Sequence, residues 1–180
     1  MRTQLVTFAA ALALGAAACE GQPETQADDP DQVIPEAAPV PAASLPDTTE
    51  AALWAYLRQS DYQHNWRLFP GKDQLYPGTE PHGMLLTTYV NDLAFDALTN
   101  GARSLPAGAI IVKENYMPDS TLAAITTMYR VEGYNPQHQD WFFAKHDPPG
   151  VAEVSGRAEM CQACHRAAPE GDYLYTARPR

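Results

Sequence analysis

The segment Cys161-Gln162-Ala163-Cys164-His165, with fifteen residues after it, is the part of the sequence around which the fold is organised. Two thiols three residues apart suit addition to the two vinyl groups of a haem, and the next histidine is then held under the iron. The thiols alone would also suit a disulfide, a redox dithiol or half a zinc site, but Cys19 is the one other cysteine in the chain. The spacing therefore predicts one covalently attached haem c, bound through Cys161 and Cys164, with His165 as the iron ligand.

The N-terminus has the pattern of an export signal. Residues 1–19 contain a charged start, an apolar run from Leu5 to Leu14 and small residues before Cys19, which predicts a signal peptide. The apolar run is shorter than the ~20 residues that span a bilayer. Because Cys19 directly follows three alanines, the signal resembles that of a bacterial lipoprotein, in which the cysteine receives lipid and becomes the mature N-terminus.

The alternative for this signal is ordinary cleavage after an Ala-x-Ala triplet, since Ala16 stands where a lipoprotein signal usually has leucine. That alternative would leave Cys19 as an unpaired thiol in an oxidising compartment. We therefore expect an exported, periplasmic protein that is tethered to the membrane by lipid on Cys19.

Residues 20–46 have the composition of a disordered tether. They contain six prolines, six acidic residues, no lysine or arginine and no aromatic residue, so they can bury too little apolar surface to fold. This segment supplies −6 of the chain's net charge of −10. The negative net charge therefore does not indicate a basic partner. The sequence also has no cluster of basic residues that would indicate binding to a nucleic acid. We expect one folded haem c domain over residues 47–180, which is a typical domain size.

The folded part is expected to be α+β, mainly an antiparallel sheet with an N-terminal helix and a short C-terminal helix. Asp47-Thr48-Thr49-Glu50 is typical of a capping box led by Asp47 and predicts a helix over about 48–60. Runs rich in β-branched and aromatic residues, joined by short turns, predict strands at Met84–Val90, Ala109–Glu114, Thr121–Val131 and Asp140–His146. A short helix is expected from Asp92 to Leu98, and the C-terminal helix from Gly156 to Arg166 carries the C-x-x-C-H motif.

A second axial ligand for the iron would have to come from upstream, because no methionine or histidine follows His165. The candidates by residue type are His64, His82, His138, His146, Met84, Met117, Met128 and Met160. A histidine in a loop is more often solvated or hydrogen-bonded, and Met84 and Met128 lie in apolar strand patterns that favour core packing. The sequence therefore assigns no residue to that position.

Five segments between about residues 80 and 176 occur in an informative order. They are Thr88–Asp92, Pro106–Glu114, Asp140–Phe142, Cys161–His165 and Asp172–Thr176. This order resembles the cytochrome P-460 family, which includes the β-sheet type of cytochrome c-prime. The resemblance implies a mainly antiparallel β fold, usually a homodimer, with a five-coordinate haem that binds small nitrogen species such as hydroxylamine and nitric oxide.

The same resemblance gives a role to Lys113. In the P-460 enzymes a lysine is joined covalently to the porphyrin edge, and Lys113 in Val112-Lys113-Glu114 stands at the matching position. A neutral amine in a pocket of low polarity has a lowered pKa and is a nucleophile toward an oxidised macrocycle. The alternative to this role is that Lys113 is an ordinary lysine at the end of a strand, with its side chain in water. Leu86 stands where the family would have a distal arginine, and an apolar wall favours binding of uncharged gases.

Three functions are consistent with these residues. The first is a haem enzyme that acts on hydroxylamine or nitric oxide and passes electrons to an external acceptor, with Lys113 tuning the macrocycle. The second is a β-type cytochrome c-prime that binds nitric oxide without turnover. The third is a simple periplasmic electron-transfer cytochrome c with two strong axial ligands. The first two require an iron position that a small nitrogen species can reach.

Overall fold

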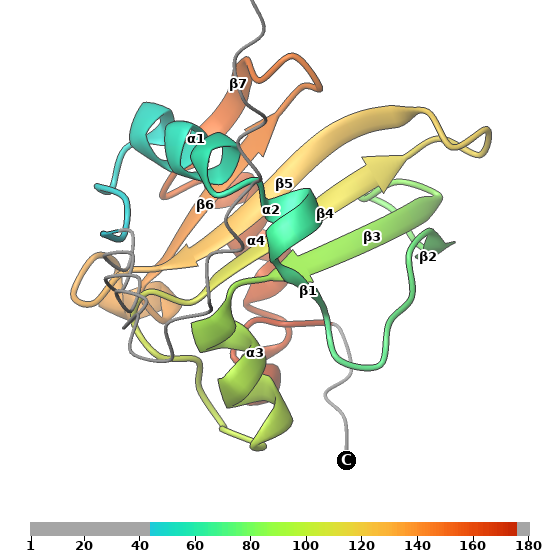
Figure 1. The fold of residues 1–180 in the computed structure, drawn as a ribbon. Coiled ribbons are helices and arrows are strands. Elements are labelled where there is room, and N and C mark those ends of the chain that lie inside the picture. The colour runs from blue at the N-terminus through green and yellow to red at the C-terminus, as the bar shows by residue number, and fades with distance from the viewer. Residues whose placement is uncertain (1–43, 176–180) are drawn as a thin grey trace, which may run out of the picture. The chain divides into compact units, whose positions relative to one another are not determined.

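The computed structural model describes residues 44–175. The predicted signal peptide at 1–19, Cys19 and the predicted tether as far as residue 43 lie outside the described residues. Residues 44–175 form an α+β fold, with a seven-stranded, antiparallel sheet and several helices (Figure 1). The predicted α+β class and its mainly antiparallel sheet are therefore confirmed.

The strands lie in the order β1-β3-β4-β5-β6-β7, and β2 also pairs with β3. In chain order the α-helices and strands are α1 (Glu50–Gln59), α2 (Tyr62–Asn65), β1 (Arg67–Leu68), β2 (Tyr76–Pro77), β3 (Leu85–Val90), α3 (Asp92–Thr99), β4 (Ile110–Tyr116), β5 (Leu122–Arg130), β6 (Trp141–His146), β7 (Ala152–Gly156) and α4 (Glu159–His165), and two short 3-10 helices lie at Pro136–His138 and Pro169–Gly171. Strands that follow one another in sequence are neighbours in space from β3 to β7, as short connections between antiparallel strands favour.

Alternation along β4 gives the sheet two buried faces, since successive side chains of a strand point to opposite sides. Val112 belongs to the core beneath α1, where Leu53 and Leu57 of the helix are fully buried. Ile111 belongs to a second core, which includes Ala158 just before α4. Figure 1 shows α1 in front of the strands and α4 behind them. The sheet therefore separates a structural face under α1 from the face that carries the Cys-x-x-Cys-His segment.

Side chains at the helix starts explain where α1 and α3 begin. The predicted cap of α1 by Asp47 is wrong, because Thr49 takes this role and its Oγ1 accepts a hydrogen bond from the Ala52 amide at 3.2 Å. Asn91 caps α3 as expected and also accepts from the Ile110 amide at 3.0 Å. One asparagine thus ties the start of a helix to the start of β4.

The four predicted strands all form, with ends shifted by one or two residues. Met84 was expected to pack in the core, but it precedes β3 and its side chain is 54% exposed. The edge strand β7 was not predicted because Ala152–Gly156 lacks a β-branched or aromatic run. Gly156 ends this strand with a φ of +86°, so α4 begins at Glu159 rather than at residue 156.

The segment after α4 is fixed to the sheet by Asp172, whose side chain is almost fully buried. Its carboxylate accepts hydrogen bonds from the Leu105 amide at 2.7 Å and from Arg130 Nη1 at 2.6 Å. Its backbone oxygen accepts from the indole nitrogen of Trp141 at 3.2 Å. These bonds attach the last described residues to β5 and β6, and so set the position of the neighbouring Tyr173.

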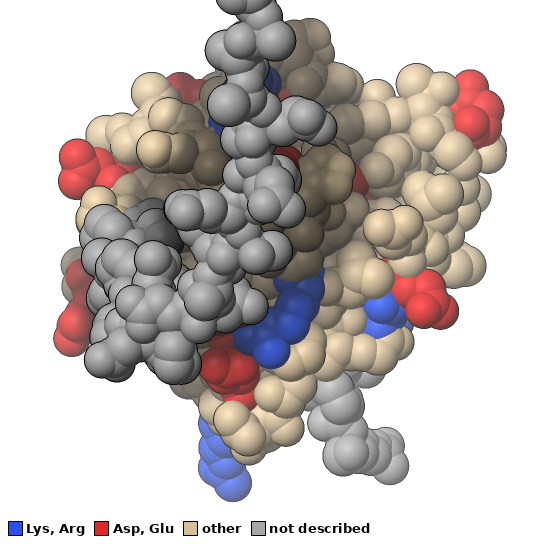
Figure 2. All heavy atoms as spheres, in the orientation of Figure 1, with Lys and Arg blue, Asp and Glu red and all other residues tan. Residues whose placement is uncertain are grey.

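The face that carries α1 has scattered charges. In Figure 2 neither the acidic nor the basic side chains on this face form a continuous patch. Arg67, for example, forms salt bridges with Asp92 at 2.9 Å and with Asp96 at 3.1 Å. Within residues 44–175, every helix falls short of the length and apolar character needed to cross a membrane.

Replacing Asp172 by asparagine should destabilise the domain by roughly 3 kcal/mol, because Arg130 would remain charged without its buried partner. Asparagine tolerates the φ of 58° at this position and keeps an oxygen acceptor for the Leu105 amide. Urea unfolding followed by circular dichroism measures the change. The matched control, Asp96→Ala in an exposed pair, should change stability by less than about 1 kcal/mol. Equally small effects of both variants would contradict a stabilising role for the Asp172 charge.

Candidate functional site

A cavity of about 900 Å³ lies on the face of the sheet that carries α4. Its volume is near the upper end of the roughly 300–1,000 Å³ that is typical of ligand pockets. Its lining includes Lys113 from β4, Leu86 from β3, and all three residues of the C-x-x-C-H motif, which are Cys161, Cys164 and His165. The fold therefore brings together, around one large cavity, the site residues that the sequence predicted within the described chain.

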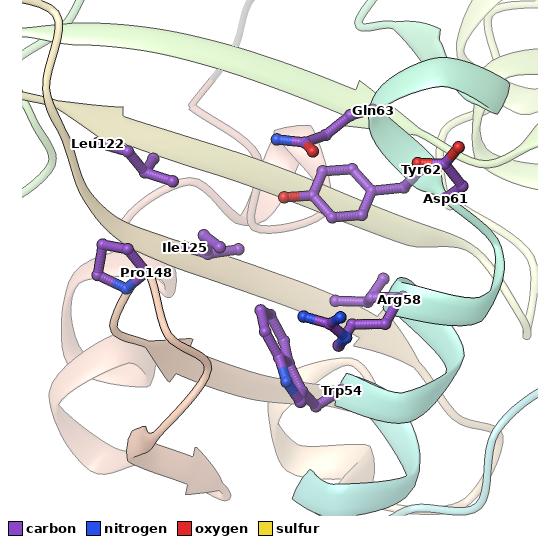
Figure 3. Close-up of a pocket in the computed structure, with 9 residues that line it drawn as sticks. Trp54, Arg58, Asp61, Tyr62, Gln63, Leu122, Ile125 and Pro148 are labelled. Carbon is purple, nitrogen blue, oxygen red and sulfur yellow. The ribbon is translucent and has the colours of Figure 1, made fainter. Parts of the chain in front are cut away.

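A second cavity, of about 330 Å³, lies on the opposite face of the sheet. Figure 3 shows Trp54 and Arg58 from α1 and Tyr62 from α2 near Leu122 and Ile125 of β5. Its lining contains none of the site residues predicted within residues 44–175. The chemistry expected from the sequence therefore belongs to the larger cavity.

The two cysteines of α4 are available for attachment. Positions three apart on a helix share one face, and both Cys161 and Cys164 line the larger cavity as free thiols. Cys161 is partly buried against the core and Cys164 is exposed. Burial raises the pKa of the Cys161 thiol, and the neighbouring Cys164 adds to this shift. Two free thiols on one side of a cavity are the arrangement that a haem bound at two points requires.

His165 is held in one tautomer by the segment that follows α4. Its Nδ1 lies 2.7 Å from the backbone oxygen of Tyr173. Because a carbonyl oxygen can only accept, Nδ1 must carry the proton, and the lone pair of Nε2 is free to bind a metal. The rings of Phe143 and Tyr175 lie beside the imidazole, at 5.3 and 5.8 Å between centroids.

The protonation state of His165 also suits metal binding. Burial lowers the pKa of this histidine, against a smaller opposing effect of the bond to Tyr173. The ring is therefore neutral at neutral pH, which is the form that binds a metal. A neutral imidazole with a fixed tautomer, two adjacent thiols and a cavity of this volume fit a haem.

Lys113 lies in the middle of β4, not at a strand end in water. It pairs with Thr88 of β3 and Thr126 of β5, and it lines the cavity. Burial, aided by the charge of Lys72, lowers the pKa of Lys113 to about 8. About a tenth of the amine is therefore neutral at pH 7.

The next residue, Glu114, points to the opposite face and fixes β4 from that side. Its fully buried carboxylate accepts hydrogen bonds from the hydroxyl groups of Tyr62 at 2.9 Å and Tyr116 at 2.6 Å. The Gln63 side chain donates a third bond at 2.5 Å. Burial, and then the charge of Glu114, raises the pKa of Tyr62, so this phenol remains a donor. Tyr62 and Gln63 belong to α2, whereas Tyr116 belongs to β4 itself, so the bonds from α2 hold β4 in place and help to orient Lys113.

The loop between β2 and β3 contributes His82, which the sequence left unassigned. Its Nδ1 lies 2.9 Å from Oδ1 of Asn115, whose amide group donates to the backbone oxygens of Lys113 and Ala124. Burial, with a contribution from the charge of Lys113, lowers the pKa of His82 to about 4. Strand alternation, which puts residues 111, 113 and 115 on one face, was a signal that could have identified Asn115. No comparable pattern marks His82.

Comparison with known families agrees with this site. Residues 59–176, about two thirds of the chain, match the family described as Cytochrome P460. A comparison with curated proteins gave no significant match. The chain belongs to the cytochrome P460 family, and membership implies a haem cofactor.

The buried amine of Lys113 should make the stability of the haem-free protein depend on pH. The amine has a pKa of about 8 when folded and 10.5 when unfolded, so between these values the unfolded chain binds more protons and stability rises with pH. In a Cys161→Ala/Cys164→Ala background, Lys113→Met should therefore stabilise the fold by roughly 3 kcal/mol at pH 7, and by less as the pH approaches 10. Urea unfolding across this range measures the difference. A constant difference would contradict the lowered pKa.

Proposed function

We propose that this member of the cytochrome P460 family is an exported mono-haem c cytochrome that binds or oxidises small nitrogen species such as hydroxylamine and nitric oxide. Cys161 and Cys164 attach the haem, and His165 binds its iron. The observation that supports this most strongly is the arrangement of His165, whose Nδ1 is bound to the Tyr173 oxygen while Nε2 remains available beside two free thiols.

The haem, when bound, supplies an iron that takes up small nitrogen ligands and exchanges electrons. The chain's own residues prepare the surroundings. The Tyr173 carbonyl orients His165 and raises the basicity of its Nε2. Phe143 and Leu86, both at least 95% buried, form apolar parts of the cavity wall.

Two properties of Lys113 support the proposal that its amine is joined covalently to the macrocycle. Its amine lines the cavity, and its pKa of about 8 leaves a neutral, nucleophilic fraction under physiological conditions. Lys113 would supply the amine nitrogen for one C–N bond at the haem edge; this bond would replace an N–H and a C–H bond and release two protons and two electrons, with the electrons taken up by the external acceptor. With this bond, the protein is an oxidoreductase that removes electrons from hydroxylamine and passes them to an external acceptor.

A second function, nitric oxide binding without turnover, is favoured by Leu86. Its side chain offers neither charge nor a hydrogen bond at a wall of the cavity. Such a wall accommodates an uncharged gas and does not assist the proton transfer that accompanies oxidation of hydroxylamine. Turnover of hydroxylamine with an added electron acceptor distinguishes the enzyme from the binding protein.

The proposed location and partners follow from the sequence pattern of the N-terminus and from the family. The protein is exported to the periplasm, is tethered through lipid on Cys19 and acts as a homodimer that passes electrons to an external acceptor. Incorporation of labelled palmitate, abolished in Cys19→Ser, supports the anchor, whereas unlabelled protein cleaved before Cys19 excludes it.

The Lys113→Arg variant tests the covalent bond through the absorption spectrum. A lysine–haem bond should give the wild-type protein a red-shifted ferrous Soret band, and the variant should show the spectrum of an ordinary haem c, because arginine stays protonated and cannot form the bond. Both proteins should retain haem after denaturation, since Cys161 and Cys164 are unchanged. Identical spectra would rule out Lys113 as the residue joined to the haem.

A further inference from the structure

The larger cavity is lined by positive charge, although the chain as a whole is acidic. Its lining includes three lysines and a single acidic residue, Glu80, whose side chain is exposed. The net charge of the whole chain is −10. A cleft lined by one sign of charge attracts ligands of the opposite sign. The lining therefore suits a group that carries negative charge.

Two of these three lysines already have a role. Lys145 on β6 forms a salt bridge with Glu153 at 2.6 Å. Lys113 is the proposed nucleophile, and burial lowers its pKa to about 8. The third is Lys72, whose amine makes no salt bridge with a carboxylate of residues 44–175. Lys72 is therefore the cation of the lining that remains for an anionic ligand.

The turn that follows β1 fixes the position of Lys72. Its backbone amide donates to the oxygen of Phe69 at 3.0 Å, and Phe69 is buried in the core and also lines the cavity. The amine of Lys72 lies 5.1 Å from the ring centre of Tyr76, within the range of a cation–π contact. The Tyr76 hydroxyl lies 2.7 Å from Oγ1 of Thr88 on β3. The ammonium group is thus held at one wall of the cavity.

The strand order places Lys72 on a different side of the cavity from the two thiols. Lys72 lies between β1 and β2, which both pair with β3, whereas the chain enters α4 from β7 at the other edge of the sheet. Burial raises the pKa of Cys161 and the charge of Lys145 on β6 opposes this rise, so Lys145 lies on the side of the thiols. Lys72 instead adds to the effect of burial on the pKa of Lys113.

From this geometry, and resting on the proposed haem function, we infer that Lys72 binds a propionate carboxylate of the haem. The vinyl groups and the propionates are on opposite edges of a haem, so attachment of the vinyl edge at α4 leaves the carboxylates for the opposite wall. There the ammonium group of Lys72 donates a charge-assisted hydrogen bond to a carboxylate oxygen. The macrocycle is then held at both edges, by α4 and by the loop between β1 and β2.

The ion pair also affects the iron. The negative charge of a propionate stabilises the ferric state, and a lysine beside it offsets part of this effect. The reduction potential of Lys72→Met should therefore be lower than that of the wild type, whereas Lys72→Arg, which keeps the positive charge, should stay close to the wild type. Redox titration of the purified, haem-loaded full-length protein measures these shifts.

Resonance Raman spectroscopy of the same proteins tests the hydrogen bond itself. One of the propionate bending bands should move to lower wavenumber in Lys72→Met, because the hydrogen bond is lost, and should stay near its wild-type position in Lys72→Arg. The matched control is Lys145→Met, which also removes an ammonium group from the cavity lining. Because Lys145 is paired with Glu153, this variant should leave the propionate bands unchanged.

Unchanged propionate bands in Lys72→Met, or equal shifts in Lys72→Met and Lys145→Met, would overturn the role of Lys72 while leaving the haem function intact. The side chain of Lys72 is only partly buried in a loop, so Lys72→Met should keep the wild-type circular dichroism spectrum. Purified protein without covalently bound haem would overturn the proposed function, and this inference with it.

Discussion

The bond between His165 Nδ1 and the Tyr173 carbonyl is the interaction on which the site depends. It decides which nitrogen of the imidazole carries the proton, and a histidine in the other tautomer would lack the lone pair on Nε2 that the proposed iron bond needs. This carbonyl is placed by its neighbour Asp172, which is bonded to Arg130, the Leu105 amide and Trp141. The orientation of His165 is therefore set by the core of the sheet, through a short segment that follows α4.

The two faces of the sheet differ in what they carry, with a packed core under α1 on one face and the large cavity on the other. On the side of α1, the carboxylate of Glu114 takes three hydrogen bonds in a fully buried position. One residue earlier, Lys113 faces the large cavity with its pKa lowered to about 8. Because neighbouring residues of one strand point in opposite directions, β4 is anchored through Glu114 on one side and presents the amine of Lys113 to the cavity on the other.

The sequence alone was sufficient to predict the α+β class, four strands and the residues at the cavity, because β-branched runs and the Cys-x-x-Cys-His spacing are local signals. The short strands β1, β2 and β7 were missed, since their pairing depends on the longer strands beside them. The sequence predicted Asp47 as the cap of α1, whereas the structure has Thr49 in this role. The reason is similar, because Glu50, which was expected to close the capping box, lies instead 3.1 Å from His146 of β6. The position of His82 depends on a loop held against β4, which no local pattern reveals.

The central claim is that the large cavity encloses a haem joined to Cys161 and Cys164. Peptide mapping by mass spectrometry of the exported protein, after denaturation and thiol alkylation, tests it most directly. The account predicts that haem remains on the peptide containing Cys161 to His165 and that neither cysteine is alkylated. Recovery of this peptide with both thiols alkylated, and of haem in the solvent extract, would contradict it.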